Sequence, residues 1–165
     1  MQNVHWPAKS RTRKAGFLFF LPDDTLNGVK SFHSISMLYP TFEITKRFTF
    51  EAAHRLPWHQ GKCARPHGHS YALEVTLGSN ALDPNDIVLD FDFLSQIVEE
   101  AVLKRYDHED LNRFFENPTA EKIAMSIYRI IAVTIRQNGW DHVAVTQVKL
   151  WETAKCSVTV KNLPV

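Results

Sequence analysis

The sequence lacks the features that mark several large classes of protein. It has only two cysteines, Cys63 and Cys156, in 165 residues, which is too few for a disulfide-dense extracellular domain, so we predict a reducing compartment, the cytoplasm. No apolar run approaches the roughly 20 residues of a membrane-spanning helix. The formal net charge is +1, so charge gives no reason to expect nucleic acid or a membrane as partner. What remains is one compact domain, for which the length is sufficient.

The sequence also lacks motifs that would reveal a common chemistry. We find no glycine-rich phosphate loop, no Walker motif, no Ser/His/Asp signature and no internal repeat. Binding of a phosphate group would therefore depend on lysine and arginine side chains.

Residues 1–40 differ from the rest of the chain. Basic residues at positions 9–14 precede a short apolar run at 16–21, which is at the short limit for a secretory signal and has no clear cleavage site after it. We expect residues 1–40 to be an N-terminal extension. It would be either a disordered tail or a stretch upstream of the natural start, for which Met37 is an alternative. Residues 41–165 would form the folded domain.

The folded part shows strand and helix patterns in a simple order. Alternating apolar and polar residues predict strands at 42–50, 69–77, 143–153 and 156–160. Between the second and third strands, helical spacing predicts two helices. The first is capped by Asp90 or Asp92 and carries an apolar stripe from Leu94 to Val102, and the second has Asn117 as its N-cap and ends at Asn138-Gly139. The order ββααββ indicates an α+β fold, an antiparallel four-stranded sheet with both helices on one face.

Three histidines surround the loop between the first two strands. His67 and His69 lie two residues apart at the start of a strand, so they share a face, and hairpin pairing would bring His54 opposite them. Three imidazoles with an open fourth position are a known arrangement for catalytic zinc, although copper, iron or nickel also accept nitrogen ligands. The plainer alternative is a turn with ordinary surface histidines.

Cys63 lies in the same loop and has two interpretations. It could be a fourth zinc ligand, which would make the site structural, or it could be a reactive thiol whose pKa a nearby cation lowers. Its spacing from the histidines does not separate these two hypotheses.

Two further positions combine acids with possible partners. Asp107 could fix the tautomer of the adjacent His108 and form an acid/base pair, or both could belong to an ordinary loop between helices. Glu152 ends an otherwise apolar and aromatic strand, so it could form an internal salt bridge or await a ligand with adjacent N–H donors.

Taken together, the motifs resemble the 6-pyruvoyl-tetrahydropterin synthase superfamily. They occur in the family order over about residues 42–160, namely FEAAH (50–54), CxxxHGH (63–69), LDF (89–91), DHxxLN (107–112), NPTAE (117–121) and WET (151–153). The three-residue gap between Cys63 and His67 favours the bacterial branch that makes 6-carboxytetrahydropterin for queuosine biosynthesis. Pro66, before the first histidine of the HGH motif, departs from the usual pattern.

The resemblance implies a role for each of these residues. His54, His67 and His69 would bind Zn²⁺. Catalysis would involve Cys63, Asp107 and His108. Glu152 would anchor the pterin ring, and Thr153 would add a contact.

The resemblance also implies a reaction and an assembly. The reaction would be that of a carbon–carbon lyase, converting 7,8-dihydroneopterin triphosphate to 6-carboxy-5,6,7,8-tetrahydropterin with release of acetaldehyde and triphosphate. The alternatives are pyruvoyl synthesis without carbon–carbon cleavage and a non-catalytic zinc- and pterin-binding module. The fold would be the tunnelling fold, in which subunits join their sheets into a barrel as a trimer or hexamer with active sites at subunit interfaces.

Overall fold

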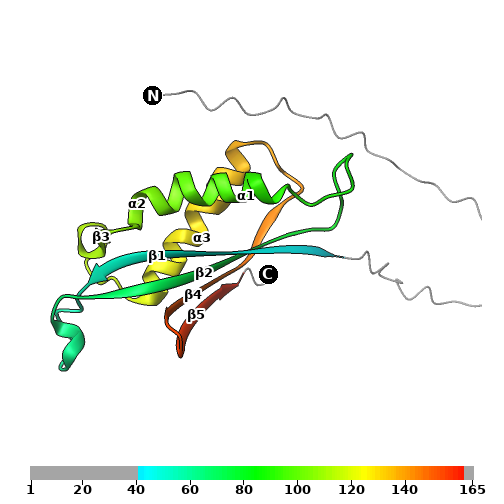
Figure 1. The fold of residues 1–165 in the computed structure, drawn as a ribbon. Helices are drawn as coiled ribbons and strands as arrows, with labels where there is room; N and C mark the ends of the chain where they lie inside the picture. Colours follow the sequence, from blue (N-terminus) through cyan, green and yellow to red (C-terminus); the bar gives the residue numbers. More distant parts are fainter. Residues whose placement is uncertain (1–40, 162–165) are drawn as a thin grey trace, which may run out of the picture. The chain divides into compact units, whose positions relative to one another are not determined.

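The computed structural model describes residues 41–161 (Figure 1). The predicted N-terminal extension, residues 1–40, lies outside the described residues, as do residues 162–165. Within the described part, no helix is long and apolar enough to cross a membrane.

The sheet confirms the four predicted strands and adds a fifth. Its order is β3-β1-β2-β4-β5. The antiparallel strands are β1 (Phe42–His54), β2 (His67–Ser79), β4 (Ala144–Thr153) and β5 (Cys156–Lys161). The added strand, β3 (Glu109–Asp110), runs parallel to β1 beside Ala52 and Ala53, which corrects the predicted number of strands from four to five. Two residues are too few for an alternating pattern, so β3 could not be read from the sequence.

Both helices pack on one face of the sheet, as predicted (Figure 1). Helix α1 (Phe91–Val98) begins at Asp90, whose side chain accepts a hydrogen bond from the Asp92 N–H at 2.6 Å. It continues without a break through a π-helical segment (Glu99–Leu103) into α2 (Lys104–Tyr106). Its apolar stripe is confirmed, with Leu94, Ile97, Val98 and Val102 buried.

Helix α3 (Ala120–Gln137) starts later than the sequence predicted. Its N-cap is Thr119, whose hydroxyl accepts from the Lys122 N–H at 3.4 Å, so the prediction of Asn117 as N-cap is wrong. The carbonyl of Asn117 instead accepts from the Thr119 N–H and forms a turn before the helix. Threonine is itself a good N-cap, which is why the start moved by two residues.

The two faces of the sheet differ in polarity. The face beneath the helices carries buried apolar side chains, including Phe50, Tyr71, Leu73, Val148 and Leu150. Residues between them on the same strands, such as Thr49 and Ser70, point to the other face and are exposed. At one end of the sheet the row of core-facing positions continues past the apolar residues to histidines. The candidate site lies there.

Candidate metal centre and its surroundings

The three predicted histidines meet at the end of the β1–β2 hairpin. His54 pairs with His67, and Ala52 pairs with His69. Directly paired antiparallel residues point to the same face, so all three imidazoles face the same space. Their nearest ring nitrogens lie within 4.8 Å of one another, and together they could hold a metal ion. The alternative of three unrelated surface histidines is therefore wrong, and His54 is only 2% exposed.

Backbone carbonyls orient two of these rings. The Nδ1 of His54 lies 2.8 Å from the Pro118 carbonyl oxygen, and the Nδ1 of His67 lies 2.8 Å from the Arg65 carbonyl oxygen. A carbonyl can only accept, so each Nδ1 must donate, which leaves Nε2 of the neutral ring as a free lone pair. Such outer hydrogen bonds fix the tautomer of histidines that bind metals.

Two of the ring nitrogens in the cluster have no hydrogen-bond partner among the described residues. Within residues 41–161, the Nε2 atoms of His54 and His69 are buried and unpaired. A buried polar atom without a partner costs about 1–3 kcal/mol. The unpaired Nε2 lone pair of the oriented His54 ring, with the buried Nε2 of His69 beside it, matches the requirements of a borderline metal such as zinc. The residues therefore fit a metal ion.

The electrostatic environment of His69 favours its neutral form, the form that can bind a cation. Burial lowers the pKa of His69 below its ordinary value of 6.5, and the nearby His54 and His67 lower it further, whereas the Glu152 carboxylate acts in the opposite direction. A histidine with a lowered pKa stays deprotonated to a lower pH, so protons compete less with a metal for its lone pair.

Glu152 lies on the face of β4 that carries the histidines, because it follows the buried Val148 and Leu150 at two-residue spacing. Trp151 pairs with Ser157 and Thr153 pairs with Cys156, so Glu152 is the extra residue of β4. Its Oε1 lies 3.5 Å from the Nε2 of His54 and 4.0 Å from the Nε2 of His69, and its side chain is 28% exposed. It is thus half-buried, and its neighbours are the histidines. Thr153 is exposed, and its hydroxyl accepts from the Cys156 N–H at 3.1 Å.

Cys63 lies in the loop between β1 and β2, outside the group of histidines. It occupies a short 3₁₀ turn (Lys62–Ala64), and its carbonyl accepts from the Leu56 N–H at 2.7 Å, which closes the loop. Its thiol is partly exposed and is not among the atoms that converge on the metal position. This geometry favours the hypothesis of a separate thiol over that of a fourth ligand.

Asp107 and His108 form the predicted pair on the other side of β1. The Nδ1 of His108 lies 3.0 Å from the Oδ1 of Asp107, which also accepts from the Glu51 N–H at 2.9 Å. That backbone hydrogen bond, together with His108, lowers the pKa of the Asp107 carboxyl. His108 has a φ of 59°, a left-handed conformation that costs a non-glycine residue of order 1–3 kcal/mol and often marks functional sites.

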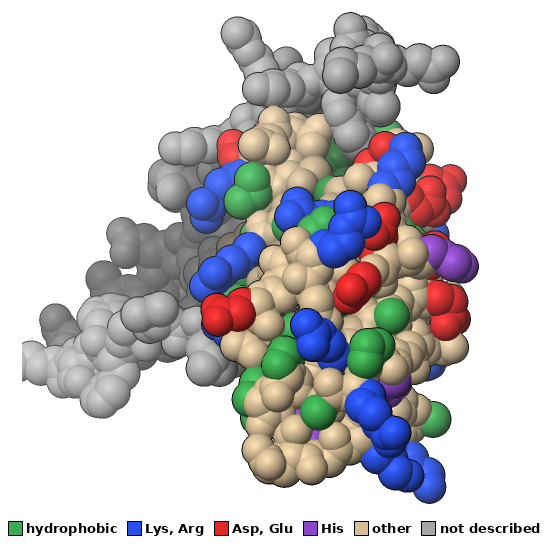
Figure 2. All heavy atoms as spheres, turned by 90° about the vertical axis from the view of Figure 1, so that its left-hand side faces the viewer, with side chains coloured by type: hydrophobic (Ala, Val, Ile, Leu, Met, Phe, Trp, Pro, Cys, Tyr) green, Lys and Arg blue, Asp and Glu red, His purple; other side chains and the backbone are tan. Residues whose placement is uncertain are grey.

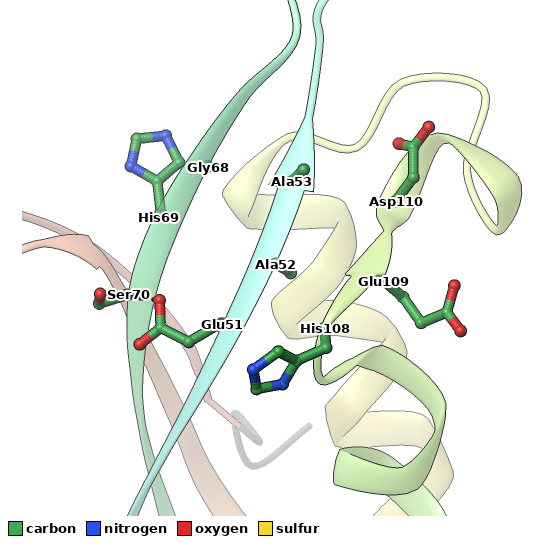
Figure 3. A pocket seen from close by; sticks show the side chains of 9 residues that line it. All are labelled: Glu51, Ala52, Ala53, Gly68, His69, Ser70, His108, Glu109 and Asp110. Atoms are coloured by element: carbon green, nitrogen blue, oxygen red, sulfur yellow. Dashed lines mark hydrogen bonds between the residues drawn. The ribbon is translucent and has the colours of Figure 1, made fainter.

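The pair and the histidine cluster lie on different sides of the sheet edge. In Figure 3 the His69 ring projects away from β2, whereas His108 lies beyond β1, beside Glu51. An open groove of about 400 Å³ runs between them over Ala53 and Gly68. Among residues 41–161, no hydrogen bond or ion pair joins Cys63 to Asp107 or His108. The structure therefore does not assemble all the predicted catalytic residues at one point of a single chain.

The sequence interpretation missed three residues that shape the site. Asn112 clamps the end of β1, since its side-chain oxygen accepts from the Arg55 N–H at 2.8 Å and its nitrogen donates to the Arg55 carbonyl at 3.0 Å. The Pro118 carbonyl orients His54. Tyr71 is fully buried, and its hydroxyl has no hydrogen-bond partner in the part of the chain that the structure describes. Burial raises the pKa of that hydroxyl, and the Glu152 charge raises it further. Alternation with His67 and His69 could have predicted which way Tyr71 points.

The loop that carries Cys63 also carries exposed basic side chains. The exposed residues Arg55, Lys62 and Arg65 belong to it. Figure 2 shows this end of the molecule, with lysine and arginine side chains toward the lower end of the face. Such side chains suit an anionic substrate.

Comparison with known proteins identifies relatives of the whole described domain. A family model described as 6-pyruvoyl tetrahydropterin synthase matches residues 43–162. The chain is 32% identical over 138 residues to the 6-carboxy-5,6,7,8-tetrahydropterin synthase of Rickettsia typhi, covering 70% of this chain and 97% of the relative. It is 42% identical over 91 residues to the protein of the same name from Synechocystis sp., covering 52% and 70%. The solved Caenorhabditis elegans 6-pyruvoyl tetrahydropterin synthase superposes with a TM-score of 0.64 at 25% identity, covering 75% of this chain and 97% of that chain.

Proposed function

Because the chain belongs to the 6-pyruvoyl tetrahydropterin synthase family, we propose that it converts 7,8-dihydroneopterin triphosphate to 6-carboxy-5,6,7,8-tetrahydropterin, releasing acetaldehyde and triphosphate, in queuosine biosynthesis. The family and the names of the relatives indicate a pterin synthase. The carboxy-forming reaction is supported by the names of the relatives from Rickettsia typhi and Synechocystis sp. and by the short spacing between Cys63 and His67.

One observation carries the proposal. Buried Nε2 atoms of His54 and His69 converge without hydrogen-bond partners beside the Glu152 carboxylate. The three histidines would hold zinc, which when bound supplies Lewis-acid polarisation to the oxygens of the substrate side chain.

The remaining residues of the chain would bind the substrate and move protons. Glu152 would accept hydrogen bonds from the 2-amino and ring N–H groups of the pterin, because two parallel carboxylate oxygens match two parallel donors. Thr153 would add a contact. Arg55, Lys62 and Arg65 would face the triphosphate.

Cys63 and His108 would transfer different protons of the substrate side chain. The Cys63 thiolate would remove and return protons on the side-chain carbons, and His108, oriented by Asp107, would serve as the other acid/base. Loss of triphosphate leaves an enol that isomerises to a dicarbonyl side chain as the ring becomes tetrahydro. Cleavage of the bond between the two carbonyl carbons consumes one water. It leaves the carboxyl on the ring and releases the other two carbons as acetaldehyde.

We propose that the working form is a homo-oligomer, a trimer or hexamer with its sites between subunits. Two features support this. Among the described residues, the outer edge of β5 and that of β1 over residues 42–50 have no strand partner, and open edges are templates for pairing with another chain. In addition, β1 and β2 separate His69 from His108 (Figure 3), so the pair from one subunit would complete the site of another.

Product analysis tests the proposed reaction. Zinc-loaded protein would be incubated with 7,8-dihydroneopterin triphosphate and the products identified by mass spectrometry, with Cys63→Ala as a matched control that retains zinc. We expect 6-carboxytetrahydropterin together with acetaldehyde. A pyruvoyl product without acetaldehyde would assign the protein to the other synthase, and unchanged substrate with a folded, zinc-loaded protein would leave only a pterin-binding module.

A further inference from the structure

Glu152 is closer to the metal position than its proposed role in binding the pterin ring requires. Its Oε1 faces the Nε2 atoms of His54 and His69 at 3.5 and 4.0 Å. Two ligands of a tetrahedral zinc, with metal–ligand distances of about 2.0–2.2 Å, lie about 3.3–3.6 Å apart. The separation from His54 falls in that range, and the separation from His69 exceeds it by less than half an ångström.

The hydrogen bond at His54 shows why the short distance to Glu152 points to a cation. Its Nδ1 must donate to the Pro118 carbonyl, so the neutral ring presents a lone pair from Nε2 toward the carboxylate oxygen. Two acceptors then face each other in a buried space with no donor between them. A cation between the two resolves this arrangement, because both groups then act as its ligands.

Glu152 also has the freedom to leave the metal. It is the bulged residue at the end of β4, and its side chain is 28% exposed. His54 and His69, by contrast, lie within the paired part of the hairpin. A carboxylate on a flexible side chain next to rigid imidazoles can move between two positions while the rest of the cluster stays in place.

We infer that Glu152 is the fourth ligand of the metal before substrate binds and exchanges that position for the pterin ring when substrate arrives. The inference rests on the proposed function, in which Glu152 holds the ring. One carboxylate group cannot serve both partners with the same oxygens, so binding of the ring would open the metal to the side-chain oxygens. A pterin ring alone would open the position without filling it. A pterin with side-chain oxygens would do both, and the site would thereby select for the complete substrate.

If zinc and the pterin ring compete for Glu152, each should weaken the binding of the other. If the ring and the metal compete for Glu152, zinc weakens ring binding by the same factor by which the ring weakens zinc binding. We expect zinc to raise the Kd of the wild-type protein for 7,8-dihydropterin, which lacks the side chain, by about tenfold, equivalent to about 1.4 kcal/mol. This measurement needs no variant. An unchanged or lower Kd in the presence of zinc would overturn the inference.

Cobalt provides a second readout that does not depend on turnover. We expect Glu152→Gln to bind Co²⁺ at least about tenfold more weakly than the wild type. We also expect 7,8-dihydropterin to shift the visible Co²⁺ bands of the wild type and not those of the variant. Glu74→Gln is the matched control, because Glu74 lies on β2 opposite Arg47 and Lys149, among the side chains of the other face, and it should match the wild type.

The outcomes separate the inference from the proposed function. Equal Co²⁺ affinity and equal spectra in Glu152→Gln and wild type would overturn the inference while the metal centre stands. Failure of the wild-type protein to bind Co²⁺ at all would overturn both. A crystal structure of the zinc-loaded protein without pterin should place a Glu152 oxygen about 2.0–2.2 Å from the ion, and a distance above about 3 Å would contradict the inference directly.

Discussion

The histidine cluster and the Asp107–His108 pair are built in opposite ways. The cluster stands on two long paired strands, and His54 is 2% exposed. The pair lies on a turn, with side chains 78% exposed for His108 and 40% for Asp107. Within one chain, the cluster provides three nitrogen ligands for a metal ion. The pair is firmly oriented by the backbone of Glu51 yet faces outward, as expected of groups that act on something supplied from outside the chain.

This difference suggests how one active site can be divided between two chains, with the metal ligands on one and the acid/base pair on the other. Strand pairing brings ligands together at fixed spacing, which suits a metal that tolerates little variation in geometry. An acid/base group needs orientation but can be supplied across an interface. The predictions below test that division, in order of decreasing effect.

Removing one ligand of the cluster should have the largest effect. His69→Ala should weaken metal binding by more than the roughly 10–100-fold that loss of an outer hydrogen-bond partner causes, and turnover should disappear with the metal. Metal content after dialysis, measured by atomic absorption, tests this. Cys63→Ala is the contrasting variant, because we expect it to keep its metal while activity falls by about 10²–10⁴-fold. Loss of metal from Cys63→Ala would restore the hypothesis that Cys63 is a ligand.

Mixing two inactive variants tests whether the pair and the cluster of a site come from different chains. His69→Ala, which disables the cluster, and His108→Ala, which disables the pair, would each be inactive alone. In randomly mixed oligomers about one site in four would combine an intact cluster with an intact pair from a neighbour, so activity should return to about a quarter of the wild-type value. The assay is turnover after co-refolding equal amounts. No recovery from mixed oligomers of the correct size would indicate that each site lies within one chain.

Acid should destabilise the metal-free protein through His69. In the unfolded chain His69 takes up a proton near pH 6.5, and in the folded protein only at a lower pH. Between these values the unfolded state binds more protons, so the free energy of unfolding decreases as the pH falls below 6.5. Urea unfolding of the metal-free protein at several pH values between 7.5 and 5 tests this. His69→Gln should show a shallower dependence, and stability that rose toward low pH would contradict the assignment.

The smallest effect concerns the helix start next to the cluster. Thr119→Ala removes the N-cap of α3 and should lower the free energy of unfolding by about 0.5–1 kcal/mol. Metal affinity should stay unchanged, because the Pro118 carbonyl that accepts from His54 is part of the backbone. Denaturant unfolding and a metal titration provide both measurements, with exposed Thr49→Ala as the control. A large loss of metal affinity would show that the cap helps to hold His54.

Much of the site could be predicted because its determinants are local. Residues two apart on a strand share a face whatever strand they pair with, so the HxH spacing puts His67 and His69 on one face. The apolar residues from Leu94 to Val102 recur at helical spacing, which predicts a helix without any tertiary contact. The motifs also indicated the family, to which the family model over residues 43–162 and a relative 32% identical assign the chain.

Other features depend on contacts between distant segments, so no local pattern could reveal them. Asn112 clamps Arg55 across 57 residues, and Pro118 orients His54 across 64. The two residues of β3 pair with β1 directly after the hydrogen bonds that join Asp107 and His108 to the backbone of Glu51, more than 50 residues earlier in the chain.

The sequence by itself determined the order of the strands and helices, the group of three histidines and the identity of the acids, because periodicity and spacing are properties of the chain. Only the tertiary structure decided that Cys63 stands apart from the cluster, that Glu152 comes within 3.5 Å of His54, and that β1 and β2 lie between His69 and His108. These features depend on strand register and on which segments pack together. Both are set by the burial of the whole core rather than by any one motif.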